Sequence, residues 1–210
     1  MVGPERGSWS RERVLGPQAR VLGVASLWAV RVVGGVARGR RLVAPSGDVR
    51  PTSDRARQAL FTMLDARVGG VEGLVVADLA CGSGALGIEA LSRGAASCTF
   101  VDTSRRSLAA AQANVGAVGL DPSAARFANT DIQAWAGLQA PASLDLVLAD
   151  PPYAWDGWSQ LLTALASVAD IVAAESDRDI PAVGGWGLLR SLRHGSTVVS
   201  VFVPTDQAVP

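Results

Sequence analysis

An apolar run that stops at a rigid polar corner constrains this chain more than any other feature. Residues 144–149 read Leu-Asp-Leu-Val-Leu-Ala, and Asp150-Pro151-Pro152-Tyr153 follows directly. A short run rich in Leu and Val is typical of a buried strand, and two prolines end it abruptly because they have no backbone N–H to extend a sheet. Ligands of open α/β sheets bind beyond the carboxyl ends of the strands. We therefore expect this corner to hold something flat and polar.

Short apolar runs alternate with helix-like spacing along most of the chain. Runs typical of strands occur at residues 74–79, 98–102, 125–128, 144–149, 171–174, 187–192 and 197–203. Helices are expected at residues 55–67, 85–93, 104–118, 132–138 and 155–169. Such alternation predicts a parallel sheet covered by helices, and the last two runs predict a hairpin. The expected fold class is α/β, with a mostly parallel seven-stranded sheet and an antiparallel C-terminal hairpin.

The charges of the chain are distributed unevenly. The formal net charge of the 210 residues is +0, yet residues 1–60 contain eleven arginines against four acids, and the remainder carries the opposite excess. Lysine is absent from the sequence. Guanidinium groups can bind both phosphates and bases, so the arginine-rich segment at residues 1–60 is compatible with RNA binding. GC-rich coding would equally explain the lack of lysine, but it does not explain why the arginines gather at one end.

The cysteines and the N-terminus bear on localisation. Cys81 and Cys98 are too few for a disulfide framework and favour a reducing cytoplasm. An apolar run at residues 21–30 loosely resembles a signal peptide, but no clean cleavage site follows it, and no run approaches the roughly 20 apolar residues of a membrane span. Residues 1–29 lack sustained periodicity. We expect them to be disordered, or to be an extension upstream of a true start near Val30.

An arginine-rich hairpin is expected directly after residues 1–29. Runs at 31–33 and 41–43 alternate apolar and polar residues, with glycines between them. Five arginines decorate this segment: Arg31, Arg38, Arg40, Arg41 and Arg50. We interpret the hairpin as a surface that grips phosphates beside the catalytic pocket, with a merely solvated hairpin face as the alternative. Residues 30–67, the hairpin and its following helix, would precede a main domain at 68–210.

A glycine-rich turn follows the first expected central strand. Gly82, Gly84 and Gly87 have the spacing G-x-G-x-x-G, which alone is weak evidence. Glycine permits close approach of a ligand, and the following helix offers free N–H groups. Asp102 ends the next strand about 20 residues on, where a carboxylate reaches ribose hydroxyls. Asp131, after the third strand, is placed either to accept a hydrogen bond from a nucleobase amino group or to cap a helix.

These blocks together resemble one family. The stretches 31–35, 50–61, 82–96 and 150–153 resemble the bacterial small-subunit ribosomal RNA guanine-N2 methyltransferases of the RsmD type, and the likeness extends over about residues 30–203. The resemblance implies a Rossmann-like fold, S-adenosyl-L-methionine as cofactor, and methylation of a guanine N2 amine in 16S ribosomal RNA. It also implies a monomer that acts in the cytoplasm on the RNA or the assembling small subunit, without a metal or a membrane.

The resemblance also assigns roles to residues. The corner would be catalytic: Asp150, Pro151, Pro152 and Tyr153. The cofactor site would comprise Asp78, Ala80, Gly82, Ser83 and Gly84 at the methionine end, Asp102 at the ribose and Asp131 at the adenine. Arg55 and Arg57 would join the hairpin arginines in binding RNA.

The chemistry of the corner agrees with these roles. An exocyclic amine on a base is a poor nucleophile because its lone pair is delocalised into the ring. The carboxylate of Asp150 and the carbonyl of Pro151 can accept both amine hydrogens, which pushes the nitrogen toward tetrahedral geometry and aims its lone pair at the methyl group. Two prolines hold these acceptors rigidly, and Tyr153 offers a face on which the base stacks.

Departures from the family pattern keep other functions open. The family usually has an aromatic residue and Ala where this chain has Ala80-Cys81, and an aromatic residue and Asp where it has His194 and Ser196. A Pro-Gly-Gly turn after the fourth-strand helix is also missing. The same Asp-Pro-Pro-Tyr corner occurs in adenine-N6 methyltransferases of DNA or RNA, and a weakly active RNA-binding assembly factor would tolerate the departures. A dinucleotide-dependent dehydrogenase fits less well, because the corner serves no hydride transfer.

Overall fold

The structure, a computed structural model, describes residues 30–43 and 54–208. The predictions for residues 1–29 and for Arg50 therefore lie outside the described residues. Of the helices within the described ranges, none combines the length and the apolar character that crossing a membrane requires.

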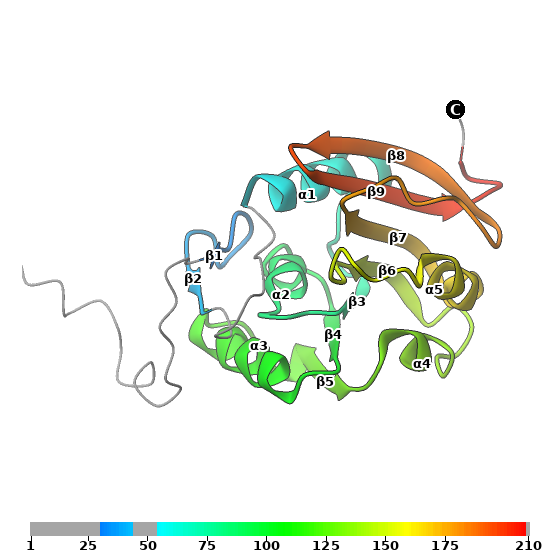
Figure 1. Cartoon of the computed structure of the whole chain (residues 1–210). Helices are drawn as coiled ribbons and strands as arrows, with labels where there is room; N and C mark the ends of the chain where they lie inside the picture. The colour runs from blue at the N-terminus through cyan, green and yellow to red at the C-terminus, as the bar shows by residue number, and fades with distance from the viewer. Residues whose placement is uncertain (1–29, 44–53, 209–210) are drawn as a thin grey trace, which may run out of the picture.

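A seven-stranded sheet runs through the centre of the molecule (Figure 1). Its strands are β3 (Val75–Leu79), β4 (Ser97–Asp102), β5 (Ala125–Asn129), β6 (Leu144–Ala149), β7 (Ala169–Ser176), β8 (Trp186–His194) and β9 (Thr197–Pro204). The strand order is β5-β4-β3-β6-β7-β9-β8. The first five strands in this order are parallel to one another, whereas β9 is antiparallel to both β7 and β8. The predicted mostly parallel sheet with an antiparallel C-terminal hairpin is thus confirmed.

Helices cover both faces of this sheet. They are α1 (Asp54–Val68), α2 (Ala85–Ser92), α3 (Arg105–Ala117), α4 (Ile132–Ala136) and α5 (Trp158–Leu165), with a short 3-10 helix at Pro122–Ala124. Alternate residues of one strand enter different cores: Leu146 and Leu148 pack with α1, α2 and α3, whereas Val147 and Ala149 pack with α4 and α5. Burial on both faces explains why β6 reads as a nearly continuous apolar run.

The N-terminal segment, residues 30–43, is called the flap below. It contains the two-residue strands β1 (Val30–Arg31) and β2 (Arg41–Leu42), which pair antiparallel as predicted. Val32, Ala37 and Leu42 are buried in the same hydrophobic cluster as residues of α2 and α3. The flap therefore packs directly on the main sheet's helices, while the division of the chain after residue 67 stays a prediction.

The predicted helix at 155–169 differs from the structure at both ends. The observed α5 begins only at Trp158, because the backbone N–H of Trp155 donates to the carbonyl of Pro152 at 2.7 Å and closes a turn before the helix. The helix ends at Leu165, and Ala169 already pairs with Leu144 in the sheet. Trp158 is buried and fills the core on the side of the sheet that α4 and α5 cover.

Candidate active site

Three neighbouring strands bring the predicted site residues to one edge of the sheet. Leu79 of β3 pairs with Val101 of β4 on one side and with Ala149 of β6 on the other. The residues that follow these three are Ala80, Asp102 and Asp150, and they consequently lie at the same level of the sheet edge. The backbone N–H of Asp150 donates to the carbonyl of Leu79 at 3.3 Å, which fixes the start of the corner against β3.

The turn after β3 is held in an unusual backbone conformation. Ala80 has φ 58°, and Gly82 and Gly84 have φ 54° and 78°. Positive φ brings the Cβ of an L-residue close to its own backbone, so Ala80 is strained by about 1 kcal/mol, whereas glycine is not. Three bonds compensate: Cys81 N–H donates to the Val101 carbonyl at 3.1 Å, Gly82 N–H to Asp102 Oδ2 at 3.0 Å, and Gly84 N–H to the Cys81 carbonyl at 2.7 Å.

Two glycines of the motif serve packing. A Cβ on Gly84 would lie 2.9 Å from Ala111 Cβ of α3, and one on Gly87 would lie 2.5 Å from the Phe100 ring of β4. Both distances are shorter than a carbon–carbon contact allows, so these positions let α2 approach its neighbours closely. Ser83 is half-buried, and its carbonyl accepts a hydrogen bond from Asn114 of α3 at 2.9 Å.

A buried carboxyl supports the helix that follows the turn. Asp78 is 1% exposed, and its Oδ2 accepts the backbone N–H of Gly87 at 2.8 Å. Burial raises the pKa of Asp78 well above its ordinary value, the bond from Gly87 opposes this, and the negative charges of Asp150 and Asp102 raise it further. Three acids thus share one edge of the sheet and repel one another. Such an edge favours a cationic ligand.

We expect Asp78→Asn to stabilise the ligand-free protein increasingly as the pH rises. Because the pKa of Asp78 is raised on folding, its contribution to stability is complete below the unfolded pKa of about 4 and is lost as the pH rises through the folded pKa. The asparagine still offers an oxygen to Gly87 but carries no charge. Melting temperatures measured from pH 5 to 8 should show a growing advantage of the variant. Asp170→Asn, at an exposed position of β7, should show no such trend, and a constant difference for Asp78→Asn contradicts the assignment.

The other two predicted cofactor acids make backbone contacts. Asp102 accepts Gly82 N–H with Oδ2 and Ser104 N–H with Oδ1 at 2.8 Å, so it ties the glycine turn to the start of α3. Each oxygen keeps a second lone pair for a ligand hydroxyl. Asp131 is exposed and caps α4 by accepting the N–H groups of Gln133 and Ala134 at 2.9 and 3.1 Å. Its capping role is present in the structure, and its adenine-binding role stays a prediction.

The corner at Asp150-Pro151-Pro152-Tyr153, predicted to be catalytic, is anchored from both sides. Asp150 is half-buried, Pro151 is buried and Pro152 is exposed. The hydroxyl of Tyr153 hydrogen-bonds the hydroxyl of Thr197, the first residue of β9, at 2.9 Å, which restricts the aromatic ring. The C-terminal hairpin therefore positions the corner.

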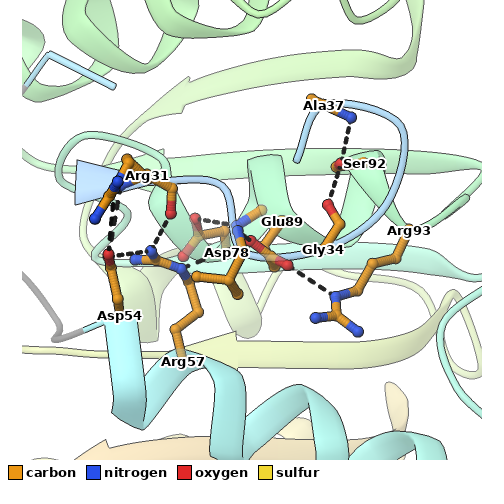
Figure 2. Close-up of polar contacts among 11 residues, drawn as sticks. Arg31, Gly34, Ala37, Asp54, Arg57, Asp78, Glu89, Ser92 and Arg93 are labelled. Carbon is orange, nitrogen blue, oxygen red and sulfur yellow. Dashed lines mark hydrogen bonds and ion pairs between the residues drawn. The ribbon is translucent and has the colours of Figure 1, made fainter. Parts of the chain in front are cut away.

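A network of polar contacts joins the flap to α1 and α2 (Figure 2). Glu89 of α2 is fully buried, accepts the backbone N–H of Val33 at 2.7 Å and the Arg93 Nε at 2.8 Å, and lies 3.7 Å from the Arg57 Nε. Ser92, at the end of α2, accepts the N–H of Ala37 at 2.9 Å and donates to the carbonyl of Gly34 at 2.7 Å. The flap is thereby held by side chains of the helix that starts at the glycine turn.

The RNA-binding prediction requires a correction at Arg57. Its side chain is completely buried, and its Nη2 donates to the Arg31 carbonyl and, at 2.8 Å, to Asp54 Oδ1. An arginine enclosed in this way joins the flap to α1 and does not reach a phosphate at the surface. The predicted arginines that are exposed are Arg31, Arg38, Arg40, Arg41 and Arg55.

A basic cavity of about 650 Å³ opens between the flap, the start of α1 and the end of β8. Arg31, Arg38 and Arg55 line it, together with His194. His194 pairs with Thr197 across the C-terminal hairpin, and Thr197 hydrogen-bonds Tyr153, so one short turn separates the cavity from the Asp150–Tyr153 corner. The sequence marked His194 only as a departure from the family pattern, because its place beside α1 depends on how the hairpin packs.

The cofactor that the resemblance implies fits this edge chemically. S-adenosyl-L-methionine carries a sulfonium and an ammonium group, and the carboxylates of Asp102 and Asp150 lie at the same edge, with the carboxyl of Asp78 buried beneath the turn. Within residues 30–43 and 54–208, no group of three or more His, Cys, Asp or Glu side chains is placed to hold a metal ion.

The strand order and the ligand-binding edge put the chain in the class of Rossmann-like methyltransferase folds. Within this class the chain belongs to the family described as "Conserved hypothetical protein 95", whose model matches residues 30–203.

Relatives of known name cover most of the chain. The "Putative rRNA methyltransferase YlbH" of Bacillus subtilis is 32% identical over an alignment of 186 residues, which covers 82% of this chain and 98% of that protein. The "Ribosomal RNA small subunit methyltransferase D" of Escherichia coli is 31% identical and covers 82% of this chain and 89% of its own length. The solved structure "Putative methyltransferase yhhF from Escherichia coli" superposes with a TM-score of 0.72 at 28% identity, over 84% of this chain and 98% of that one.

Proposed function

We propose that this protein transfers a methyl group from S-adenosyl-L-methionine to the exocyclic N2 amine of a guanine in 16S ribosomal RNA. The observation that carries the proposal is the adjacency of two features: an acid-lined sheet edge ending in Asp150-Pro151-Pro152-Tyr153, and a cavity lined by Arg31, Arg38 and Arg55 one turn away. The names of the relatives support ribosomal RNA as the substrate class. We also propose that the protein acts in the cytoplasm as a monomer.

The cofactor would supply an electrophilic methyl group, and the residues of this chain would hold it in place. The turn at Ala80 to Gly84 lets a ligand approach the backbone closely, because two of its residues are glycines with positive φ. Asp102 is fixed by two backbone N–H groups and would accept the ribose hydroxyls with its remaining lone pairs. Asp78 would offset positive charge from below the turn.

The corner would then orient the target amine. The carboxylate of Asp150 and the carbonyl of Pro151 would each accept one amine hydrogen, while the ring of Tyr153 stacks on the base. As the amine nitrogen takes the methyl group, the carbon–sulfur bond of the cofactor would break and its sulfur would leave as a neutral thioether. The positive charge that passes to the nitrogen would be stabilised by the Asp150 carboxylate until the nitrogen loses a proton to solvent. The bond from Tyr153 to Thr197 holds the ring ready, so the rate depends chiefly on positioning.

Identifying the methylated nucleoside tests the proposal. The full chain is incubated with labelled cofactor and small subunits or assembly intermediates from a strain that lacks the modification, and the RNA is digested to nucleosides. N2-methylguanosine is the expected product. N6-methyladenosine would instead establish the alternative activity, which the corner alone permits. Absence of any cofactor binding by calorimetry, with RNA binding retained, would leave an RNA-binding assembly factor.

A further inference from the structure

A second hollow continues the basic cavity along the outer side of α1. It has a volume of about 340 Å³ and lies between the second half of α1 and the middle of β8. Ala59 of α1 lines both hollows, so they meet there. Since the first cavity lies one turn from the catalytic corner, the two together form a groove, called the α1–β8 groove below, that leads away from the site.

The walls of this groove carry positive charge along its length. Arg67 stands on the α1 side and Arg190 on the β8 side of the second hollow, and both side chains are exposed. Asp54 is the acid among the residues that line the two hollows, and it is paired with Arg57 at 2.8 Å. The groove thus has an arginine on each wall and little negative charge, which complements a polyanion.

The floor between these two arginines is apolar. Met63 and Ala66 of α1 and Leu192 of β8 line it, and Leu192 is 37% exposed although it is a large hydrophobic residue. A strip of apolar surface flanked by guanidinium groups suits a nucleic-acid strand, because sugars and base faces contact apolar atoms while phosphates reach the arginines.

We propose that the α1–β8 groove binds a second stretch of the RNA substrate, with Arg67 and Arg190 contacting phosphates remote from the target base. This inference rests on the proposed function, since the RNA is the methylation substrate. It adds a binding surface on α1 and β8 to the arginines of the flap. Contacts with this remote stretch would strengthen RNA binding equally before and during methyl transfer, so their loss should appear in KM rather than in kcat.

The test compares variants that differ only in exposed charge. Arg67→Gln/Arg190→Gln is measured beside the wild type, Arg67→Lys/Arg190→Lys, and Arg126→Gln. Arg126 is an exposed strand arginine of β5, at the opposite edge of the sheet. Labelled small-subunit RNA is titrated by fluorescence anisotropy over a series of salt concentrations, and methyl transfer and cofactor affinity are measured on the same preparations. Melting temperatures verify that each variant is folded.

We expect the double glutamine variant to bind RNA about tenfold more weakly, and the slope of log K against log salt to fall by about one for each arginine lost. Its KM for RNA should rise, with kcat and cofactor affinity unchanged. The lysine variant should stay close to the wild type, because it keeps the charges, and Arg126→Gln should show no change.

The outcomes separate this inference from the proposed function. If the double glutamine variant keeps its RNA affinity and salt slope, the proposal that the α1–β8 groove binds RNA is wrong, even if methyl transfer by the wild type is confirmed. If the double glutamine variant binds RNA more weakly but the wild type transfers no methyl group, RNA binding by the groove is supported and the proposed methyltransferase activity is wrong. If sedimentation shows instead a protein complex that the substitutions dissociate, with RNA binding intact, the groove is a protein interface and the inference is wrong.

Discussion

Asp150→Ala is expected to lower kcat by at least about a hundredfold while cofactor affinity changes little. The carboxylate is one of two acceptors proposed for the target amine, and losing one preorganised group at a reacting centre typically reduces kcat by about 10²–10³-fold. The contacts that would hold the cofactor come chiefly from the glycine turn and Asp102, which this substitution leaves in place, so the loss of cofactor affinity should be small beside the loss of kcat. Single-turnover methyl transfer and calorimetry with the cofactor would measure the two quantities separately.

Two control variants give this experiment its contrast. Asp102→Ala removes the acceptor for Gly82 and Ser104 and should act in the opposite way, weakening cofactor binding by about tenfold or more. Asp170→Ala changes an exposed acid near the amino end of β7 and should alter neither quantity. A variant at Asp150 that keeps kcat but loses the cofactor would contradict its catalytic role.

Glu89→Ala is expected to destabilise the protein by about 3–5 kcal/mol, because removing one partner of a buried ion pair leaves the other charge uncompensated. Here two arginines lose a partner: Arg93, whose Nε lies 2.8 Å from Glu89, and the fully buried Arg57, whose Nε lies 3.7 Å from Glu89 and which keeps Asp54 as a partner. The backbone N–H of Val33 would lose its acceptor as well. A loss of this size is a large share of the 5–15 kcal/mol that stabilises a typical domain.

Urea unfolding of matched variants would measure this effect. Asp65 is the other acidic partner of Arg93, and its side chain is exposed at the surface. Asp65→Ala should therefore reduce stability by less than about 1 kcal/mol. Glu89→Gln keeps an acceptor for Val33 without the charge and should fall between the two. Equal midpoints for Glu89→Ala and Asp65→Ala would show that the buried network contributes no more than a surface pair.

The sheet and its acidic edge could be predicted from sequence because their signals are local. A strand that is buried on both faces, such as β6, can be predicted from its six apolar-rich residues alone. The position of an acid at the end of a strand is fixed by that strand. The helix cap at Asp131 is local too, since its partners are two and three residues away.

The locations of the Arg57 and His194 side chains could not be predicted from local sequence. Arg57 lies in a segment with exposed arginines, and its burial depends on contacts with the Arg31 carbonyl of the flap and with Glu89 of α2. His194 enters the basic cavity because the C-terminal hairpin lies against α1, an arrangement that no short pattern encodes. Long-range packing decides both positions.

The attachment of the flap to Ser92 and Glu89 also determines a spacing. Helix α2 begins directly after Gly84 of the glycine turn and ends at Ser92, whose hydroxyl bonds the flap. Its eight residues rise by about 12 Å in total at about 1.5 Å per residue. One rigid helix therefore fixes the distance between the exposed arginines of the flap and the glycine turn. Inserting or deleting a residue in α2 would change that length and rotate one end relative to the other by about 100°.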